Sequence, residues 1–253
     1  MAGKVPNRKD SSRASDVKSV LTWLESRGSK KAREEMGPRY GIWTEKAFGI
    51  AVGELRKMAK EIGTDHDLAM KLWATGWHDA RMLATMIDDP TQVTPAQMDA
   101  CCKDFDNWGI VDTACFVLFD RTPHVFSKVQ QWAKRKPEFE KRAAFALLAS
   151  SALHDKTTTD DVYLKCFPLI ERAANDDRNF VKKGVSWALR AIAGRSTILR
   201  DASIDLAERL AASEDPTERW VGKDVLRDIK RPLIAKRAEK KDEKRATTKT
   251  KNR

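Results

Sequence analysis

The sequence predicts an all-α protein of about 12 helices, arranged as about six stacked pairs. Five segments are variants of one helix, and they lie at residues 77–87, 107–119, 139–150, 180–193 and 219–229. The same position in these segments recurs after 31, 30, 41 and 40 residues, a spacing typical of helical-repeat arrays. In addition, no segment sustains the two-residue alternation of a β-strand.

In the first part of the chain, residues 1–14 are polar, and a helical pattern begins at Ser15. Apolar residues then keep the three-and-four spacing of an amphipathic helix, so we expect a helix with Ser15 as its N-cap and Gly28 at its end. The segment 36–50 is rich in glycine and aromatic residues, and we expect a loop there. Three further helices are expected: one ending at Gly63, one from Thr64 or Asp65 to Gly76, and one from His78 to Asp88.

The second part of the chain shows the same pattern of helix starts and ends. Thr94 and Pro95 open a helix, since proline is favoured in a first turn. Pro168 lies within a helical pattern and is expected to kink that helix, whereas Pro137 and Pro216 lie near helix starts. The remaining helices are expected at residues 107–119, 123–135, 137–153, 158–174, 178–193, 197–212 and 216–229.

Charge is concentrated at the C-terminal end of the chain. The formal net charge is +11, and residues 230–253 carry 11 basic and 3 acidic residues. We therefore divide the chain into a flexible N-terminus (1–14), one repeat domain (15–229) and a basic, disordered tail (230–253). The tail is either simply solvated or an arm that raises non-specific affinity for a polyanion.

Cysteine usage and hydropathy indicate where the protein works. None of the four cysteines forms a CxxC pair and no histidine cluster accompanies them, so a zinc site is not expected. They are expected to be reduced and mostly buried. The N-terminus lacks an apolar signal region, and the longest apolar stretch, 143–153, is too short to span a bilayer. We expect a cytoplasmic, monomeric protein with no metal and no membrane contact.

The repeated helical position carries mostly charged residues. It reads Arg81, Asp112, Arg142, Lys183 and Lys223, and stacking would place these residues on one continuous surface. Trp108 lies one turn before Asp112, and Trp187 lies one turn after Lys183, so each tryptophan shares a helix face with a charged position. Asp112 could alternatively pair with Arg142 and simply satisfy it. The other tryptophans are interpreted as structural: Trp23, Trp43, Trp73, Trp77, Trp132 and Trp220.

This combination of groups suggests chemistry on a nucleic acid. Lysine and arginine along a surface track phosphates without reading sequence. A carboxylate among them can stabilise developing positive charge or position a water, as N-glycosidic cleavage through an oxocarbenium-like state requires. An alkylated purine is itself cationic and is a good leaving group, and tryptophan faces attract cations.

Three segments carry a resemblance to a known family. Trp108-Gly-Ile-Val-Asp112, Lys141-Arg142-Ala-Ala-Phe145 and Asn179-Phe-Val-Lys-Lys-Gly-Val-Ser-Trp187-Ala-Leu-Arg190 closely resemble the DNA alkylation-repair glycosylases of the AlkD type. Those proteins are single-domain solenoids of HEAT-like helical pairs. The resemblance covers roughly residues 15–229 and is strongest at 104–119, 139–150 and 178–195.

The resemblance implies an activity and a set of site residues. The family excises cationic alkylpurines, such as N7-alkylguanine and N3-alkyladenine, from duplex DNA without a metal or other cofactor. By position, Asp112 matches the catalytic carboxylate, and Arg142 matches an arginine that supports DNA at the site. The aromatic residues on the lesion side match Trp108 and Trp187, and Tyr40 is a further candidate. The backbone-contacting basic groups match Lys182, Lys183 and Arg190.

The sequence also departs from the family pattern. Gly109 directly follows Trp108, where a second acid is often found, and Gly184 lies inside the Trp187 helix. These glycines either open space beside the site or mark a branch with altered function. We therefore keep two alternatives to a monofunctional glycosylase: a non-catalytic HEAT-like binder of damaged or branched DNA, and a protein-interaction scaffold.

Overall fold

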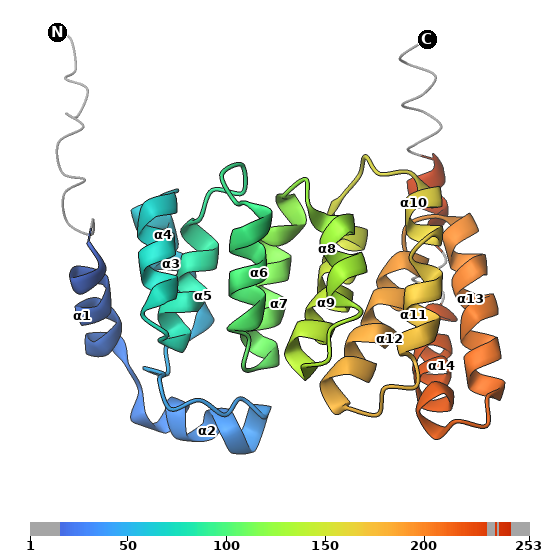
Figure 1. Ribbon diagram of the computed structural model, residues 1–253, viewed down its shortest axis with the longest axis horizontal. Helices are drawn as coiled ribbons and strands as arrows, with labels where there is room; N and C mark the ends of the chain where they lie inside the picture. Colours follow the sequence, from blue (N-terminus) through green and yellow to red (C-terminus); the bar gives the residue numbers. More distant parts are fainter. Residues whose placement is uncertain (1–15, 232–235, 237, 244–253) are drawn as a thin grey trace, which may run out of the picture. The chain divides into compact units, whose positions relative to one another are not determined.

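The computed structural model describes residues 16–231, 236 and 238–243 (Figure 1). All regular secondary structure in these residues is helical, which confirms the predicted all-α class. The chain forms two compact units, residues 1–93 and 94–253. None of the helices in the described ranges is long and apolar enough to cross a membrane.

The first unit contains five helices in its described residues. α3 and α4 pack against α5, whose buried Asp79 accepts hydrogen bonds from the backbone amides of Phe48 (2.6 Å) and Ile50 (2.8 Å). These bonds fasten the segment before α3 to the start of α5. The helices are α1 (Val17–Arg27), α2 (Lys30–Tyr40), α3 (Val52–Ile62), α4 (His66–Ala74) and α5 (His78–Ile87).

Two local predictions for this unit are corrected. The N-cap of α1 is Asp16, which accepts from the Ser19 amide at 2.8 Å, because Asp16 directly precedes the first helical residue; Ser15 lies outside the described residues. The loop expected over 36–50 was wrong at its start, since residues 36–40 form the last turns of α2. This helix ends at Gly41, which adopts the left-handed conformation (φ 66°) that glycine favours.

The second unit is built around α9. The residues of α9 from Ala143 to Ala149 are fully buried, because α7, α8 and α12 all pack against it; α12 and α13 in turn pack against α14 (Figure 1). Thr94, Asn107 and Ser196 act as N-caps of their helices. The elements are α6 (Pro95–Lys103), α7 (Trp108–Val117), the 3-10 helix η1 (Phe119–Arg121), α8 (Val125–Trp132), α9 (Glu138–His154), α10 (Asp160–Leu164), α11 (Phe167–Ala173), α12 (Asn179–Ala193), α13 (Thr197–Ala212) and α14 (Pro216–Ile229).

Pro168 does more than kink its helix. The single helix expected over residues 158–174 is two helices, α10 and α11, separated at Lys165 and Cys166. Proline has no N–H to bond the carbonyl of Leu164, so the hydrogen-bond ladder stops there and restarts with Pro168 in the first turn of α11.

The tail predicted over 230–253 is described only in part. Residue 236 and residues 238–243 are helical, and the Asp242 carboxylate accepts from both the backbone amide (2.9 Å) and the Oγ1 hydroxyl (2.8 Å) of Thr197. Asp242 therefore adds a second cap at the start of α13. Segments 1–14, 232–235, 237 and 244–253 lie outside the described residues, and the division into flexible ends and one repeat domain stays a prediction.

All four cysteines are buried free thiols, as predicted. Burial raises the pKa of the Cys166 thiol to about 11, and it raises the pKa of Cys115 well above its usual range. The thiols of Cys115 and Cys166 are therefore protonated and unreactive at neutral pH. Across the residues that the structure describes, no group of three His, Cys, Asp or Glu side chains could hold a metal ion.

Candidate functional site

The centre of the candidate site is an ion pair between Asp112 of α7 and Arg142 of α9. Arg142 donates from Nε to Oδ1 of Asp112 (3.0 Å) and from Nη2 to Oδ2 (2.7 Å), so the two planar groups meet side by side. The Arg142 side chain is 8% exposed and that of Asp112 is 22% exposed. Arg142 therefore belongs to the core, whereas Asp112 keeps an edge open to solvent.

The ionisation of Asp112 reflects two opposing effects. Burial raises the pKa of the Asp112 carboxyl, and the charge and hydrogen bonds of Arg142 act in the opposite direction. An ionised carboxylate has about four acceptor positions. Two are occupied by Arg142, so the group can accept further donors while its orientation stays fixed.

Arg142 is itself positioned by α12. Its third nitrogen, Nη1, donates to the carbonyl oxygen of Phe180 at 2.7 Å. The amide of Phe180 donates to Oε1 of Glu138, at the start of α9, at 3.0 Å. Both the backbone carbonyl and the backbone amide of Phe180 are therefore hydrogen-bonded to side chains of α9. These bonds leave Arg142 little freedom to move.

A second ion-pair cluster lies beside this contact. Asp176 accepts from Lys141 Nζ (2.9 Å) and from Nε (2.8 Å) and Nη2 (2.5 Å) of Arg178. The remaining Arg178 nitrogen, Nη1, donates to the carbonyl of Lys136 at 2.6 Å. The Arg178 hydrogen bonds, followed by those of Lys141, lower the pKa of Asp176 to about 2. This cluster ties the loop before α12 to the loop before α9.

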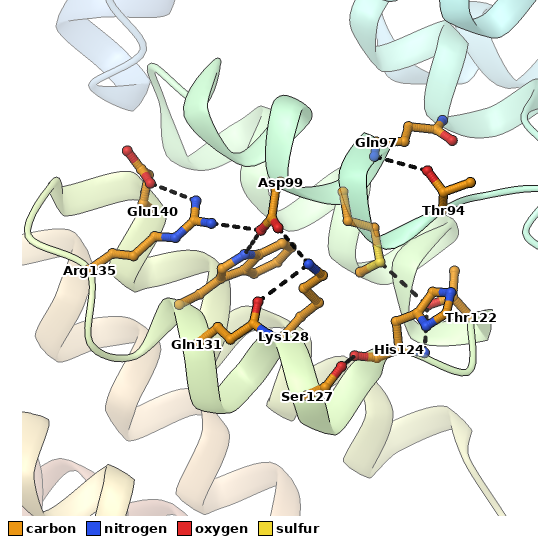
Figure 2. Close-up of polar contacts among 12 residues, drawn as sticks. Thr94, Gln97, Asp99, Thr122, His124, Ser127, Lys128, Gln131, Arg135 and Glu140 are labelled. Carbon is orange, nitrogen blue, oxygen red and sulfur yellow. Dashed lines mark hydrogen bonds and ion pairs between the residues drawn. The ribbon is translucent and has the colours of Figure 1, made fainter.

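Polar contacts from α6 and α8 also reach the start of α9 (Figure 2). Asp99 of α6 accepts from Lys128 Nζ (2.6 Å), Trp132 Nε1 (2.8 Å) and Arg135 Nη2 (2.6 Å). Arg135 also donates to Glu140 at 2.8 Å, two residues before Arg142. Although burial opposes it, these contacts lower the pKa of Asp99 overall. Two ionic networks therefore contact α9 within two residues of Arg142, one through Glu140 and one through Lys141.

The two predicted lesion-side tryptophans lie on α7 and α12, the helix of Asp112 and a helix that packs against α9. Trp108 lies one turn before Asp112 on α7, and Trp187 lies one turn after Lys183 on α12; both indoles are half-buried. Both helices pack against α9, which carries Arg142. The structure thus brings Asp112 and Arg142 into contact and places the tryptophan-bearing helices on either side of α9.

The three basic residues predicted to contact a DNA backbone differ in their surroundings. Lys183 is exposed. Lys182 is half-buried, and its Nζ lies 5.3 Å from the ring centroid of Trp220. Arg190 donates to the carbonyl of Ser186 (3.3 Å) and lies 3.9 Å from Asp224 and 3.7 Å from Asp228, so its charge is balanced within the protein. Lys183 has the surroundings that best suit a phosphate contact.

The remaining candidates lie in the first unit. Tyr40 is exposed at the end of α2, where the Arg39 guanidinium lies 5.2 Å from its ring. Arg81 lies 5.3 Å from the Trp73 ring and donates to the Trp73 carbonyl at 3.3 Å. Within its own unit, Arg81 therefore has a packing role that the repeat pattern did not reveal.

Two of the tryptophans interpreted as structural are exposed. Trp220, interpreted as structural, is 37% exposed on α14, and Trp43 is 72% exposed; Trp132 is fully buried as expected. A signal for Trp220 was available, because it lies three residues before Lys223 in one of the five repeated segments and so shares a face with a charged position.

Comparison with known proteins places this arrangement in a family. Residues 20–212, more than half of the chain, match the family described as DNA alkylation repair enzyme. No curated protein matches the chain. A solved structure is similar over 84% of this chain and 95% of its own, with a TM-score of 0.70 and 18% sequence identity. That structure represents a new family of proteins related to the HEAT-like repeat DNA glycosylases, with affinity for branched DNA structures. The likeness shows the HEAT-like fold, and the match over residues 20–212 shows that the chain belongs to the DNA alkylation repair enzyme family.

Proposed function

We propose that the protein is a monofunctional DNA glycosylase that hydrolyses the N-glycosidic bond of cationic alkylpurines, such as N7-alkylguanine and N3-alkyladenine, in duplex DNA. One observation carries the proposal: Asp112 is a partly exposed carboxylate held in one orientation by the buried Arg142. A carboxylate fixed in this way is suited to stabilising charge that develops during a reaction, because it needs no reorganisation.

The chemistry follows from the substrate's own charge. As the bond between the sugar carbon and the purine nitrogen breaks, its electron pair moves to the base and neutralises the alkylpurinium cation. Positive charge develops on the sugar, where the Asp112 carboxylate would stabilise it. A water held by a remaining Asp112 acceptor position would add to the sugar carbon and give up a proton. The base departs without protonation, so the reaction needs no general acid, and because water is the nucleophile it needs no lysine Schiff base.

The Arg142 pairing limits which bases can be released. The guanidinium reduces the negative potential of Asp112 while fixing its orientation. Less electrostatic stabilisation is then available to the sugar cation, so the site favours bases whose bonds are already labile. Cationic alkylpurines meet this requirement, whereas neutral purines do not.

The position of the charged residues supports contact with a DNA backbone. Asp112, Arg142 and Lys183 are each the fifth residue of their helices, α7, α9 and α12. These three residues therefore lie near helix N-termini, where the helix dipole favours anions. Lys183, with Lys182 beside it, would contact phosphates there, and Trp108 and Trp187 would lie against the modified nucleotide.

The test is release of free base from a duplex carrying one N7-methylguanine. We expect release by the wild type and its loss in Asp112→Asn, a change of nearly equal size that removes the charge and replaces one of the two acceptor oxygens by an amide donor. Asp201→Asn, the same change at an exposed position on α13, is the matched control and should release base like the wild type. Full release by Asp112→Asn would contradict the assigned role.

The pairing of Asp112 with Arg142 also favours a second candidate, a non-catalytic binder of damaged or branched DNA. A carboxylate whose partner is a buried arginine can serve structure alone. This second function predicts that the wild type and Asp112→Asn both bind DNA in a salt-dependent way and that neither releases base. Absence of any salt-dependent affinity for DNA would instead favour a protein-interaction scaffold.

A further inference from the structure

Trp220 occupies the same helix position as the charged residues of the candidate site. It is the fifth residue of α14, as Asp112, Arg142 and Lys183 are of α7, α9 and α12. The start of α14 is well defined, because Asp215 accepts from the amides of Thr217 (2.8 Å) and Glu218 (2.9 Å). By this measure Trp220, rather than Lys223, continues the row.

Contacts between α12 and α14 show how the two helices align, and they place Trp220 opposite Lys182, the residue before Lys183. Residues 38 positions apart meet three times: Lys182 with Trp220, Ser186 with Asp224, and Arg190 with Asp228. The second and third contacts end in carboxylates, whereas the first ends in an exposed indole. The chain therefore places an aromatic ring, not a carboxylate, where the row reaches α14.

The surroundings of Trp220 are cationic. Lys182 Nζ lies 5.3 Å from the ring centroid, Lys183 and Lys223 are exposed, and Lys223 is one turn from Trp220. The nearby carboxylate of Asp224 is occupied by Ser186 (2.6 Å) and Arg227, and Arg190 lies 3.9 Å from it. Positive charge beside Trp220 thus remains available to an external anion.

We propose that Trp220 is a stacking platform for an unpaired nucleobase and that Lys182, Lys183 and Lys223 hold its phosphates. An exposed indole among lysines is the arrangement by which proteins bind single-stranded nucleic acid, because every base has a π-face and every nucleotide a phosphate. Lys182 covers the ring through the end of a flexible side chain. An incoming base displaces this ammonium, which then reaches the adjoining phosphate.

This inference rests on the proposed function only in taking DNA as the ligand, and it deepens it by naming a substrate class. The preferred DNA is a duplex that adjoins an unpaired segment, such as a fork. A fully paired duplex presents stacked bases that a single surface indole cannot reach. The protein should therefore bind a fork more tightly than a linear duplex of the same paired sequence.

The experiment compares the affinities of the full chain for a fork and for a linear duplex by fluorescence anisotropy. Trp220→Leu is expected to weaken fork binding by roughly 5- to 150-fold, the range given by one lost base stack. Its linear-duplex affinity should change by less than about twofold. Trp220→Phe keeps an aromatic ring and should retain most of the fork affinity. Trp43→Leu, at the other exposed tryptophan, is the matched control and should match the wild type on both DNAs.

A measurement on the wild type guards against misfolding of the variant. Ultraviolet cross-linking to a fork that carries 5-iodouracil in its unpaired arm should attach the arm to Trp220, as located by peptide mass analysis. Unchanged fork affinity in Trp220→Leu, an equal loss on both DNAs, or attachment away from α14 would each overturn the proposal.

The outcomes separate this inference from the glycosylase proposal. If the wild type releases no base but Trp220→Leu loses its preference for the fork, the glycosylase proposal fails and the stacking site stands. If the wild type releases base and Trp220→Leu keeps its preference for the fork, only the stacking site fails.

Discussion

Gly184 of α12 lies against the side chain of Arg142, with room for one more carbon atom. A β-carbon at Gly184 would be 3.6 Å from Cγ of Arg142 and 3.5 Å from Cβ of Phe145, both ordinary van der Waals distances. Gly184 is therefore not required by the packing of α9 and α12. Because alanine is the better helix former, Gly184→Ala should raise the free energy of unfolding by up to about 1 kcal/mol. Urea denaturation followed by circular dichroism measures this change.

Gly222 of α14 provides the contrasting control. A β-carbon there would lie 2.3 Å from the backbone nitrogen of Ala211 and 2.5 Å from the carbonyl oxygen of Ala207, so α13 and α14 touch through their backbones. Gly222→Ala should therefore destabilise the protein, by about 1–3 kcal/mol, because backbone atoms cannot move aside as side chains do. A loss of stability in both variants would show that α9 and α12 also need a glycine at their contact.

Asp99 should matter more to stability than its partner Lys128. Removing the carboxylate in Asp99→Ala leaves Lys128, whose side chain is 3% exposed, as an uncompensated buried charge, and it also leaves Trp132 Nε1 without its acceptor. We expect the free energy of unfolding to fall by about 3 kcal/mol. This is the lower end of the range for breaking a buried ion pair, because Asp99 itself is partly exposed.

Lys128→Met tests the same network from the other side. It removes the charge but keeps an unbranched apolar stem, and Asp99 still accepts from Trp132 and Arg135. Its loss in the same denaturation experiment should be clearly smaller than that of Asp99→Ala. If the two variants lost equal free energy of unfolding, the lost ion pair, rather than the unpaired buried ammonium of Lys128, would account for the destabilisation.

The repeat pattern predicted the all-helical fold, and it offered the pairing of Asp112 with Arg142 as one alternative, which the structure contains. Equivalent positions 30 residues apart, Asp112 and Arg142, meet in space because stacked helices bring equivalent residues together. The sequence predicted that Pro168 would kink one helix. Its effect is larger, because the helical hydrogen bonds are interrupted and two separate helices, α10 and α11, result.

Other features depend on contacts that no local pattern contains. The end of α2 contains Gly37 and Pro38, which indicate a loop, yet the Trp43 ring packs over Gly37, where a β-carbon would lie 2.5 Å from it. The balance of charge on Arg190 depends on Asp224 and Asp228, which lie more than 30 residues away. Tertiary contacts of this kind decide which basic residues remain available to a ligand.

Asp176 should make the protein sensitive to acid. Hydrogen bonds from Arg178 and then Lys141 lower its pKa to about 2, below the value of about 3.9 expected in the unfolded chain. The folded state therefore gains stability from the ionised carboxylate above about pH 4, and loses it as the pH falls toward 2.

The corresponding variant is Asp176→Asn. Its free energy of unfolding should be lower than that of the wild type at neutral pH, by on the order of 1 kcal/mol after allowance for solvent screening. The difference should shrink between about pH 4 and pH 2, because the wild type then loses the same contribution. The exposed control Asp201→Asn should run parallel to the wild type. A constant difference for Asp176→Asn across this range would show that packing, not ionisation, sets the contribution of Asp176.

Asp112 should respond to pH in the opposite sense. Burial raises the pKa of its carboxyl despite the opposing effect of Arg142, so folding favours the protonated form. Its contribution to stability is therefore present below the unfolded pKa and is lost as pH rises through the folded pKa. The proposed reaction, however, needs the ionised form. Base release should therefore rise with pH through a midpoint that lies above the usual range of an exposed aspartate.

Replacing Arg142 by glutamine tests the cause of this midpoint. The substitution removes the positive charge and the hydrogen bonds that favour ionisation, so the midpoint should move to still higher pH, whereas Arg142→Lys, which keeps the charge, should move it less. Single-turnover base release from an N7-methylguanine duplex, measured across pH at saturating protein, reports the midpoint separately from DNA affinity. A midpoint that stays in place in Arg142→Gln would mean that a group other than Asp112 titrates. In that case the arginine would hold the carboxylate for the sake of the fold, and a different acidic group would have to stabilise the positive charge on the sugar.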